Sequence, residues 1–321
     1  MEDRKKHIDG ARRFGSVFRM QGWFLMFFLF LTQQVAVVWA QSFGPRRTCG
    51  AVEHPDLVEA SGLVKSRRHD DLLWTHNDSG DSARVFAIRT DGSHAGIIYL
   101  QNIDAVDWED IAMGPGPDQS RDYLFIGDIG DNHSSRKSIQ IHRFAEPEEK
   151  ETIDGKLIRD VDTFRFVYPD GPRDAETLIA DPLTKDLIII SKEINAARVY
   201  RAPFPQISGR VDTLIYETTW EHSLITAGDL SRDGQWLIIK NYTQVFIYQR
   251  NPDNHSFTQD TTFIVHYIPE PQGEAVAWDR SMMSFFTVSE VKRGIPAVLY
   301  SYSFHGEHSD FPYCKTPDSV K

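Results

Sequence analysis

Short apolar runs separated by polar turns fill the chain from residue 57 onward. Typical runs are "DLLWTH" (71–76), "DYLFIG" (122–127), "DLIIIS" (186–191) and "VLYSYSF" (298–304). They are rich in β-branched and aromatic residues and are bounded by Gly, Pro, Asp and Asn, which is typical of strands and turns. The one helix-like stretch, "EPEEKET" (146–152), is too short to form a stable helix by itself. The pattern therefore predicts an all-β protein.

One repeated motif organises these runs into five units. The segments are "ASGLVKS" (60–66), "WEDIAMG" (108–114), "DAETLIA" (174–180), "AGDLSRD" (227–233) and "QGEAVAW" (272–278). The key positions of the units are Gly62, Asp110, Glu176, Asp229 and Glu274, which lie 48, 66, 53 and 45 residues apart. A period near fifty with three or four strands per unit is typical of a β-propeller. Five blades are favoured, and the long 66-residue interval leaves room for a sixth.

The two ends of the propeller are expected to meet. The last unit supplies three strands, so a segment at 41–56 can add the missing strand and close the ring, with the propeller over 57–305 and a tail at 306–321. The chain has two cysteines, Cys49 and Cys314, and each lies close to one of these ends. In an oxidising compartment such a pair indicates a disulfide, whereas two free thiols remain the alternative.

The first forty residues have the features of a targeting segment. Basic residues precede the apolar run "WFLMFFLFL" (23–31), and "VWA" (38–40) ends in a small residue, which predicts a signal peptide cleaved after Ala40. The alternative is an uncleaved anchor with the rest of the chain in a lumen, as in a type II membrane protein. Either topology places the propeller outside the cytosol. Asn77, Asn132, Asn241 and Asn254 begin N-x-S/T sequons and are candidate glycosylation sites.

Acidic residues dominate the charge of the remaining chain. Without residues 1–40 there are 29 Lys and Arg against 43 Asp and Glu, a formal charge of −14. This excess argues against nucleic acid or an anionic membrane surface as a partner. It suits a protein that holds cations.

The repeat explains where many of these acids lie. The innermost strand of each blade lines the central channel, so an acid repeated at its start forms a ring at one mouth. The sequence predicts metal ligands there, with Glu109 and Asp174 reinforcing them: Asp110, Asp128, Glu176, Asp229 and Glu274. Hard carboxylate ligands without cysteine favour Ca²⁺. The alternative is that these acids cap turns and accept backbone N–H bonds between blades.

A second set of polar residues follows the next strand of each unit and is expected around the same mouth. His76 and Glu193 are candidate general bases, and Lys192, Lys240, Arg173 and Asn77 are candidates for holding a substrate. The stretch "FIGDIGDNHSSR" (125–136) places Asp128 at this position but lacks the spacing of an EF-hand loop. No nucleophile elbow, Walker loop or zincin motif occurs.

Six ordered motifs resemble a known group of proteins. They are "LLWTHNDSGDSARVFAI", "VDWEDIAMGPGP", "YLFIGDIGDNHSSR", "YPDGPRDAETLIADP", "AGDLSRDG" and "QGEAVAW", and they span about residues 60–300. This set resembles a family of extracytoplasmic β-propellers found in bacteria and some animals, whose biochemistry is uncharacterised. The resemblance implies a propeller fold and one functional face. The architecture is more distantly similar to calcium-dependent propeller phytases and lactonase-type propellers, although the phytase motifs are not matched.

Two functions of different classes remain open from the sequence. One is a metal-dependent hydrolase of a phosphoester or lactone, acting on a small anionic substrate. The other is a non-catalytic extracellular module in which a structural ion supports loops that bind a ligand or a protein. In both, the mature protein is expected to be secreted, monomeric and without a membrane span.

Overall fold

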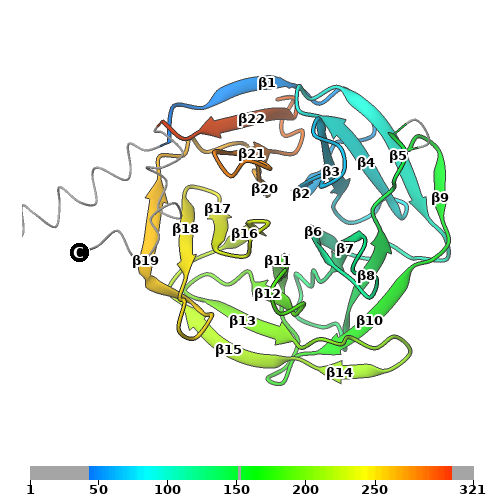
Figure 1. Ribbon diagram of the computed structural model, residues 1–321, viewed down its shortest axis with the longest axis vertical. Coiled ribbons are helices and arrows are strands. Elements are labelled where there is room, and N and C mark those ends of the chain that lie inside the picture. Colours follow the sequence, from blue (N-terminus) through cyan, green and yellow to red (C-terminus); the bar gives the residue numbers. More distant parts are fainter. Residues whose placement is uncertain (1–42, 151–152, 306–321) are drawn as a thin grey trace, which may run out of the picture.

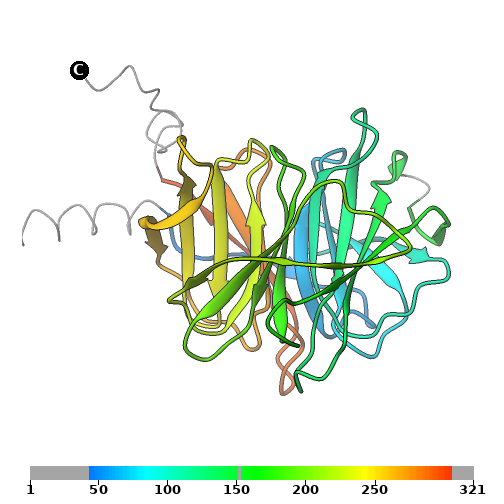
Figure 2. The ribbon, with the colours of Figure 1, turned by 90° about the horizontal axis from the view of Figure 1, so that it is seen from below.

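A computed structural model describes residues 43–150 and 153–305 of the chain. Its regular elements are β-strands, arranged as five small sheets in a ring around a central axis (Figure 1). Seen from the side, the strands of neighbouring sheets stand next to one another around the ring (Figure 2). The protein is a five-bladed β-propeller, which confirms the predicted fold class and the favoured blade number. Within the described residues, no helix is long and apolar enough to cross a membrane.

Each blade is a sheet that begins on the axis and ends at the rim. Blade 1 contains β2 (Ala60–Lys65), β3 (Leu72–Asn77), β4 (Arg84–Arg89), β5 (His94–Leu100) and β9 (Lys156–Ile158). Blade 2 contains β6 (Trp108–Pro115), β7 (Asp122–Asp128), β8 (Ile139–Ala145), β10 (Asp162–Val167) and β14 (Val211–Thr213). Blade 3 contains β11 (Ala175–Ala180), β12 (Leu187–Ser191), β13 (Ala197–Ala202) and β15 (Ile215–Trp220).

The last two blades complete the ring. Blade 4 contains β16 (Ile225–Leu230), β17 (Trp236–Asn241), β18 (Val245–Arg250) and β19 (Phe257–Val265). Blade 5 contains β20 (Ala275–Trp278), β21 (Ser284–Val288), β22 (Val298–Ser303) and, as its outermost strand, β1 (Arg47–Ala51).

Strand β1 closes the ring, as the sequence predicts. It pairs antiparallel with β22, so the start and the end of the propeller lie in one sheet (Figure 1). Cys49 lies in this closing strand, half-buried and without a disulfide partner among the described residues. Its predicted partner, Cys314, lies outside the described residues, so the disulfide stays a prediction.

The 66-residue interval between Asp110 and Glu176 has a structural cause other than a sixth blade. Between β8 and β10 the chain returns to blade 1, where β9 pairs in parallel with β5. A similar crossing joins β14 in parallel to β10 of blade 2 before the chain enters β15. The extra residues of the 66-residue interval therefore extend the rim of blade 1, whereas β14 lies in the next interval and extends the rim of blade 2.

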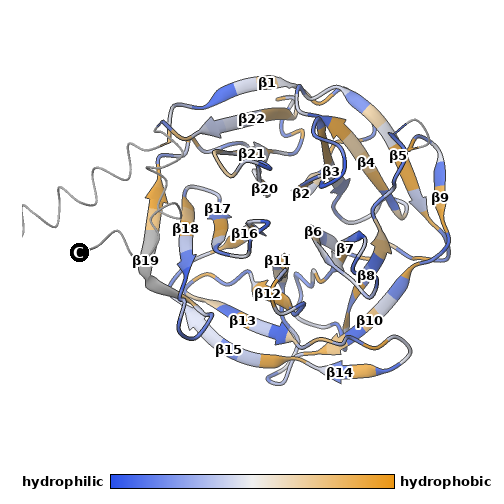
Figure 3. Ribbon diagram, in the orientation of Figure 1, coloured by the Kyte–Doolittle hydropathy of each residue, from blue (hydrophilic) through white to orange (hydrophobic). Residues whose placement is uncertain are grey.

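The hydrophobic core is divided among the five interfaces between blades. One cluster of buried side chains lies at each interface, for example Trp74 and Leu124 between blades 1 and 2. Much of β4, β8 and β12, which run through these interfaces, consists of apolar residues (Figure 3). The tryptophans of the strands all lie in this core: Trp74, Trp108, Trp220, Trp236 and Trp278. They pack the blades together rather than facing the channel as ligand platforms.

Candidate metal centre at the channel mouth

Irregularities in strand pairing determine which acids reach the mouth of the channel. In four blades the pairing of the innermost strand with its neighbour skips one residue near the start of that strand. The skipped positions are Gly62, Glu109, Glu176 and Thr226. Bulges of this kind redirect a side chain out of the regular alternation. Glu274, which directly precedes β20 and bridges to Ser61 of β2, is the corresponding residue of blade 5.

Five carboxylates from three blades converge there. Asp78 follows β3, Asp107 and Glu109 lie at the start of β6, and Asp174 and Glu176 lie at the start of β11. Ligand oxygens of Asp78, Asp107 and Glu109 all lie within 4.8 Å of one another, and so do those of Glu109, Asp174 and Glu176. We call these five residues the acidic mouth. Glu109 belongs to both groups.

Burial makes the charges of the acidic mouth costly. Glu109 and Glu176 are each 2% exposed. Desolvation raises the pKa of both well above the usual glutamate value, and the neighbouring acids raise them further. Desolvation and the charges of Asp107 and Glu274 raise the pKa of Asp78 to about 6. A bound cation would favour the ionised forms of all these groups.

Lys192 is the cation nearest to these acids. Its ammonium group donates a hydrogen bond to Glu176 Oε1 and lies 3.5 Å from Glu274 Oε1. The pKa of Lys192 is raised because these two carboxylates outweigh its desolvation. Glu274 also accepts from the hydroxyl of Tyr242 at 2.5 Å. Glu176 Oε2, by contrast, is buried and has no hydrogen-bond partner in the structure.

The loop Ile129–Asp131 covers the acidic mouth. The backbone N–H of Asp131 donates to Asp174 Oδ1 at 2.8 Å, and the N–H of Gly130 donates to the carbonyl of Asp107. A Cβ at Gly130 would lie 2.1 Å from Glu109 Oε1 and 2.6 Å from Asp107 Oδ2. Only glycine lets the backbone approach these carboxylates so closely, which explains the second glycine of "GDIGDN".

Three of the predicted metal ligands have other partners. Asp128 forms an ion pair with Arg136 at 2.6 Å and accepts the N–H groups of Val106 and Asp107. Asp110 accepts the N–H of Leu178 in blade 3 at 2.9 Å, and Asp229 accepts the N–H of Trp278 in blade 5 at 2.8 Å. The bonds of Asp110 and Asp229 join the innermost strands of different blades, which is the capping role that the sequence left open, whereas those of Asp128 stay within blade 2.

The predicted bases and substrate contacts are spread around the mouth. His76 is fully buried, its Nδ1 bonds the carbonyl of Asn77, and burial lowers its pKa to about 4. Glu193 is partly exposed and forms an ion pair with Arg173 at 3.2 Å. Lys240 is fully buried and donates to the carbonyl of Gly273, and desolvation lowers its pKa to about 8.

Asn77 is held mainly by the segment that precedes β2. Its Oδ1 accepts the N–H groups of Val58 and Glu59, and its Nδ2 donates to Asp56 and Asp81. With 4% of its surface exposed, the side chain is occupied in fixing the chain that leads into β2.

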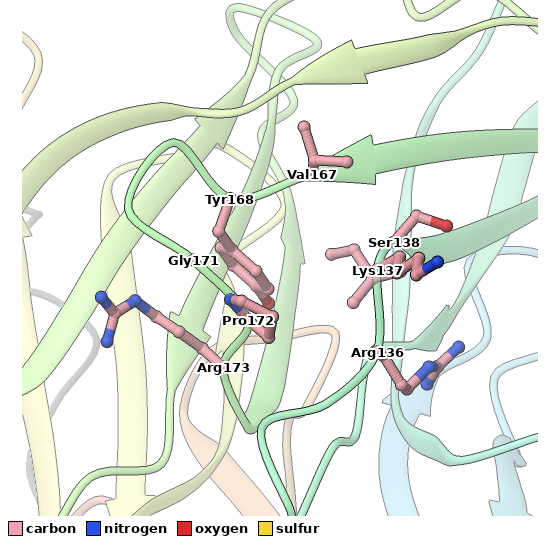
Figure 4. A pocket seen from close by; sticks show the side chains of 9 residues that line it. Arg136, Lys137, Ser138, Val167, Tyr168, Gly171, Pro172 and Arg173 are labelled. Atoms are coloured by element: carbon pink, nitrogen blue, oxygen red, sulfur yellow. The ribbon is translucent and has the colours of Figure 1, made fainter.

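A small cavity of about 40 Å³ lies beside the mouth, between blades 2 and 3. Arg136, Tyr168 and Arg173 are among its lining residues, and the two arginine side chains extend to opposite sides of it (Figure 4). The Tyr168 hydroxyl is buried without a hydrogen-bond partner. The cavity has room for an ordered water, which would satisfy this hydroxyl.

Two members of the acidic mouth, Asp78 and Asp107, were not predicted as metal ligands: the sequence places Asp78 near the mouth only as the neighbour of His76 and Asn77, and it does not single out Asp107. Each lies in a turn rather than in the repeated strand motif, within "HNDSG" and "VDWED". The available signal was their adjacency to predicted site residues: Asp78 follows Asn77 directly, and Asp107 lies two residues before Glu109.

The comparisons with known proteins do not assign the chain to a family. No protein-family model matches the chain, and no curated protein matches it. Among solved structures, the Dos1 propeller has a TM-score of 0.37 at 13% identity, covering 76% of this chain and 68% of its own. A protein of Thermus thermophilus provisionally described as an oxidoreductase (glucose dehydrogenase) has a TM-score of 0.45 at 10% identity, covering 80% and 99%. Likeness at this level carries no activity over to the present chain.

The fold and the site together define the class of this protein. It is a five-bladed β-propeller whose channel mouth carries groups of buried and half-buried acids that could hold a metal ion.

Proposed function

We propose that this protein is a Ca²⁺-dependent hydrolase with its metal centre at the acidic mouth, acting on a phosphoester or a lactone. The observation that carries the proposal is the group formed by Glu109, Asp174 and Glu176. Their ligand oxygens lie within 4.8 Å of one another, two of the three residues are buried, and Glu176 Oε2 has no partner. Buried carboxylates so close together are stable in ionised form only beside a cation.

The ligand chemistry supports a hard cation. All five residues of the acidic mouth offer carboxylate oxygens, and neither group includes histidine or cysteine. Calcium takes six to eight oxygen ligands in flexible geometry, and carboxylates can bind it through one oxygen or two. Zinc and copper would favour nitrogen or sulfur ligands, which the mouth does not provide.

The chain supplies the other groups that hydrolysis needs. When bound, the ion would polarise a substrate oxygen and lower the pKa of a bound water. Lys192, half-enclosed beside Glu176, supports the binding of an anionic substrate group at the same place. Of the two predicted general bases we keep Glu193, because His76 has no exposed surface with which to reach a substrate.

The experiment is to assay purified protein against phosphoester and lactone panels with EDTA and with added Ca²⁺. We expect hydrolysis that EDTA removes and Ca²⁺ restores, and a loss of at least about a hundredfold in Glu176→Gln. Asp104→Asn is the matched control, because Asp104 is exposed, lies in the loop before β6 and belongs to neither carboxylate group. Turnover that is unaffected by EDTA, or absent from every substrate, would argue against the proposal.

A second candidate, a binding module with a structural ion, is favoured by one observation. The acidic mouth takes its ligands from blades 1, 2 and 3, so an ion there would cross-link three blades. This function predicts that EDTA lowers the melting temperature while no substrate is turned over. Thermal melts with and without EDTA, run beside the activity assay, separate the two functions.

We also propose that the protein is secreted and belongs to the extracytoplasmic propeller family that its six motifs resemble. The propeller architecture that this resemblance implies is the one observed. Amino-terminal sequencing of the exported protein tests secretion: a start at Gln41 supports cleavage, whereas an intact start would indicate the anchored form.

A further inference from the structure

The acidic mouth contains two overlapping sets of ligands. Asp78 and Asp107 approach Glu109 from one side, and Asp174 and Glu176 approach it from the other. Each set alone provides three carboxylates with oxygens within 4.8 Å of one another. A single ion can lie at the centre of only one set, so one ion would leave two acids of the other set without a cation.

The shared residue has no side-chain partner in the described part of the chain. Glu109 is 2% exposed, and among the hydrogen bonds and ion pairs of the described residues only its backbone carbonyl takes part, accepting from Ser61 Oγ, while the buried Oε2 of Glu176 beside it has no partner. It faces Gly130, whose missing side chain leaves the space that the carboxylate fills. A buried carboxylate left without a donor on either oxygen has the capacity to ligate a cation through both of them.

The balance of charge indicates more than one ion. Among the described residues, the ion pair that involves a member of the acidic mouth is the one between Lys192 and Glu176. With Lys192 counted, a single divalent ion leaves the five carboxylates with a surplus of negative charge. A second divalent ion brings the total close to balance, with one negative charge left when Glu274, which shares Lys192, is included.

We propose that the acidic mouth binds two divalent cations bridged by Glu109, and that its substrate is a phosphoester rather than a lactone. One ion would take Asp174 and Glu176 as its other ligands, and the second would take Asp78 and Asp107. This inference rests on the proposed function of the same site.

The choice of substrate follows from the chemistry of paired ions. Two cations bridged by a carboxylate can stabilise the attacking and the leaving oxygen of an in-line displacement at phosphorus. The oxygen of water forms a new bond to phosphorus, and the ester P–O bond breaks with its electron pair remaining on the departing oxygen. A proton from the water ends on that oxygen, so the products are an alcohol and a phosphate with one ester bond fewer. Opening a lactone needs only one polarised carbonyl and would not require the second ion.

The experiment measures calcium equivalents on the full-length protein by equilibrium dialysis and elemental analysis. We expect about two equivalents on the wild type and on Asp104→Asn, and about one on Asp78→Asn/Asp107→Asn. The double variant should also lose phosphoesterase activity by at least about a hundredfold, and Glu109→Gln should lose both ions. Circular dichroism and a thermal melt of each variant identify any that fails to fold, and Asp107→Asn alone then replaces the double variant.

The outcomes separate the two proposals. One equivalent on the wild type that Asp78→Asn/Asp107→Asn retains would overturn the paired site and leave a single-ion hydrolase standing. Lactone turnover without phosphoester turnover would also overturn the inference. No bound calcium on the wild type would overturn the proposed function itself.

Discussion

The ammonium group of Lys192 lies between two buried carboxylates, donating to Glu176 and standing 3.5 Å from Glu274. It therefore links the start of blade 3 to the start of blade 5 across the channel mouth. The same charge that stabilises these acids in the absence of metal opposes a divalent ion beside Glu176.

Replacing Lys192 should thus have effects of opposite sign on metal affinity and on stability. Lys192→Gln is expected to tighten calcium binding by about tenfold, because it removes a positive charge a few ångströms from the ion. It should also lower the melting temperature of the metal-free protein, because Glu176 and Glu274 lose their shared partner. Calorimetric titration and melts in EDTA measure both. Unchanged affinity would show that no ion binds next to Glu176.

Gly130→Ala tests the close approach of the loop to the acidic mouth. The added Cβ would lie 2.1 Å from Glu109 Oε1, so either the loop or the carboxylate must move. We expect calcium affinity to fall by at least about tenfold. Asn132→Ala is the control in the same loop, since its side chain is exposed. Equal affinities for the two variants would contradict this account of Gly130.

Asp229→Ala tests whether this predicted metal ligand instead joins two blades. The substitution leaves the N–H groups of Leu230 and Trp278 without their acceptor, which should lower the free energy of unfolding by about 2–4 kcal/mol. Calcium stoichiometry should stay at the wild-type value. Urea denaturation and dialysis measure the two quantities, with the exposed Asp253→Asn as control. A variant that loses calcium but keeps its stability would restore Asp229 as a ligand.

The metal-free protein should lose stability between about pH 6.5 and 8. Burial raises the pKa of Asp229 to about 7, and burial together with Glu274 raises that of Glu290 to about 8. A carboxyl group with a raised folded pKa contributes stability that is present below its unfolded pKa and lost as pH rises through the folded value. The buried histidines oppose this only at the lower end of the window: burial lowers the folded pKa values of His76 and His142 to about 4, so stability rises only while the unfolded imidazoles lose their protons near pH 6.5.

Urea midpoints in EDTA across this window check the expectation. The free energy of unfolding should fall by about 1 kcal/mol per pH unit near pH 7, and Glu290→Gln should flatten the fall. The fall should level off near pH 8, where Lys240, whose pKa desolvation lowers to about 8, loses its proton in the folded state and adds stability as pH rises. Stability that rises with pH over the same window would contradict the assigned cause.

The ends of the propeller offer a separate test. Cys49 lies in the closing strand β1, and the sequence predicts that it forms a disulfide with Cys314. Peptide mapping of the unreduced native protein should recover the two cysteines in one linked fragment. Two separately alkylated peptides would show free thiols.

Much of the architecture was predictable because it is periodic. Strand runs and a motif at intervals near fifty residues give five blades, and the missing strand of the last unit indicates closure by the amino-terminal segment. The crossings of β9 and β14 were not predictable, because three-residue strands on the rim carry no strong hydrophobic pattern.

The site was predictable in location but not in detail. Glu176 was placed at the mouth by its position in the repeat. Glu109 and Asp174 were placed there because they lie within two residues of the repeat positions Asp110 and Glu176, respectively. In the sequence repeat, Asp110 and Asp229 align with Glu176. In the structure, the residue at the bulge that corresponds to Glu176 is instead Glu109 in blade 2, one residue earlier, and Thr226 in blade 4, three residues earlier. Because a bulge depends on pairing between strands, the local sequence does not show which acid turns into the channel.

The most direct test of the central claim is the calcium content of the native protein compared with that of Glu109→Gln. The account predicts about two equivalents in the wild type, none in the variant, and a wild-type melting temperature that EDTA lowers to that of the variant. A wild type that carries no metal and melts identically with and without EDTA would contradict it.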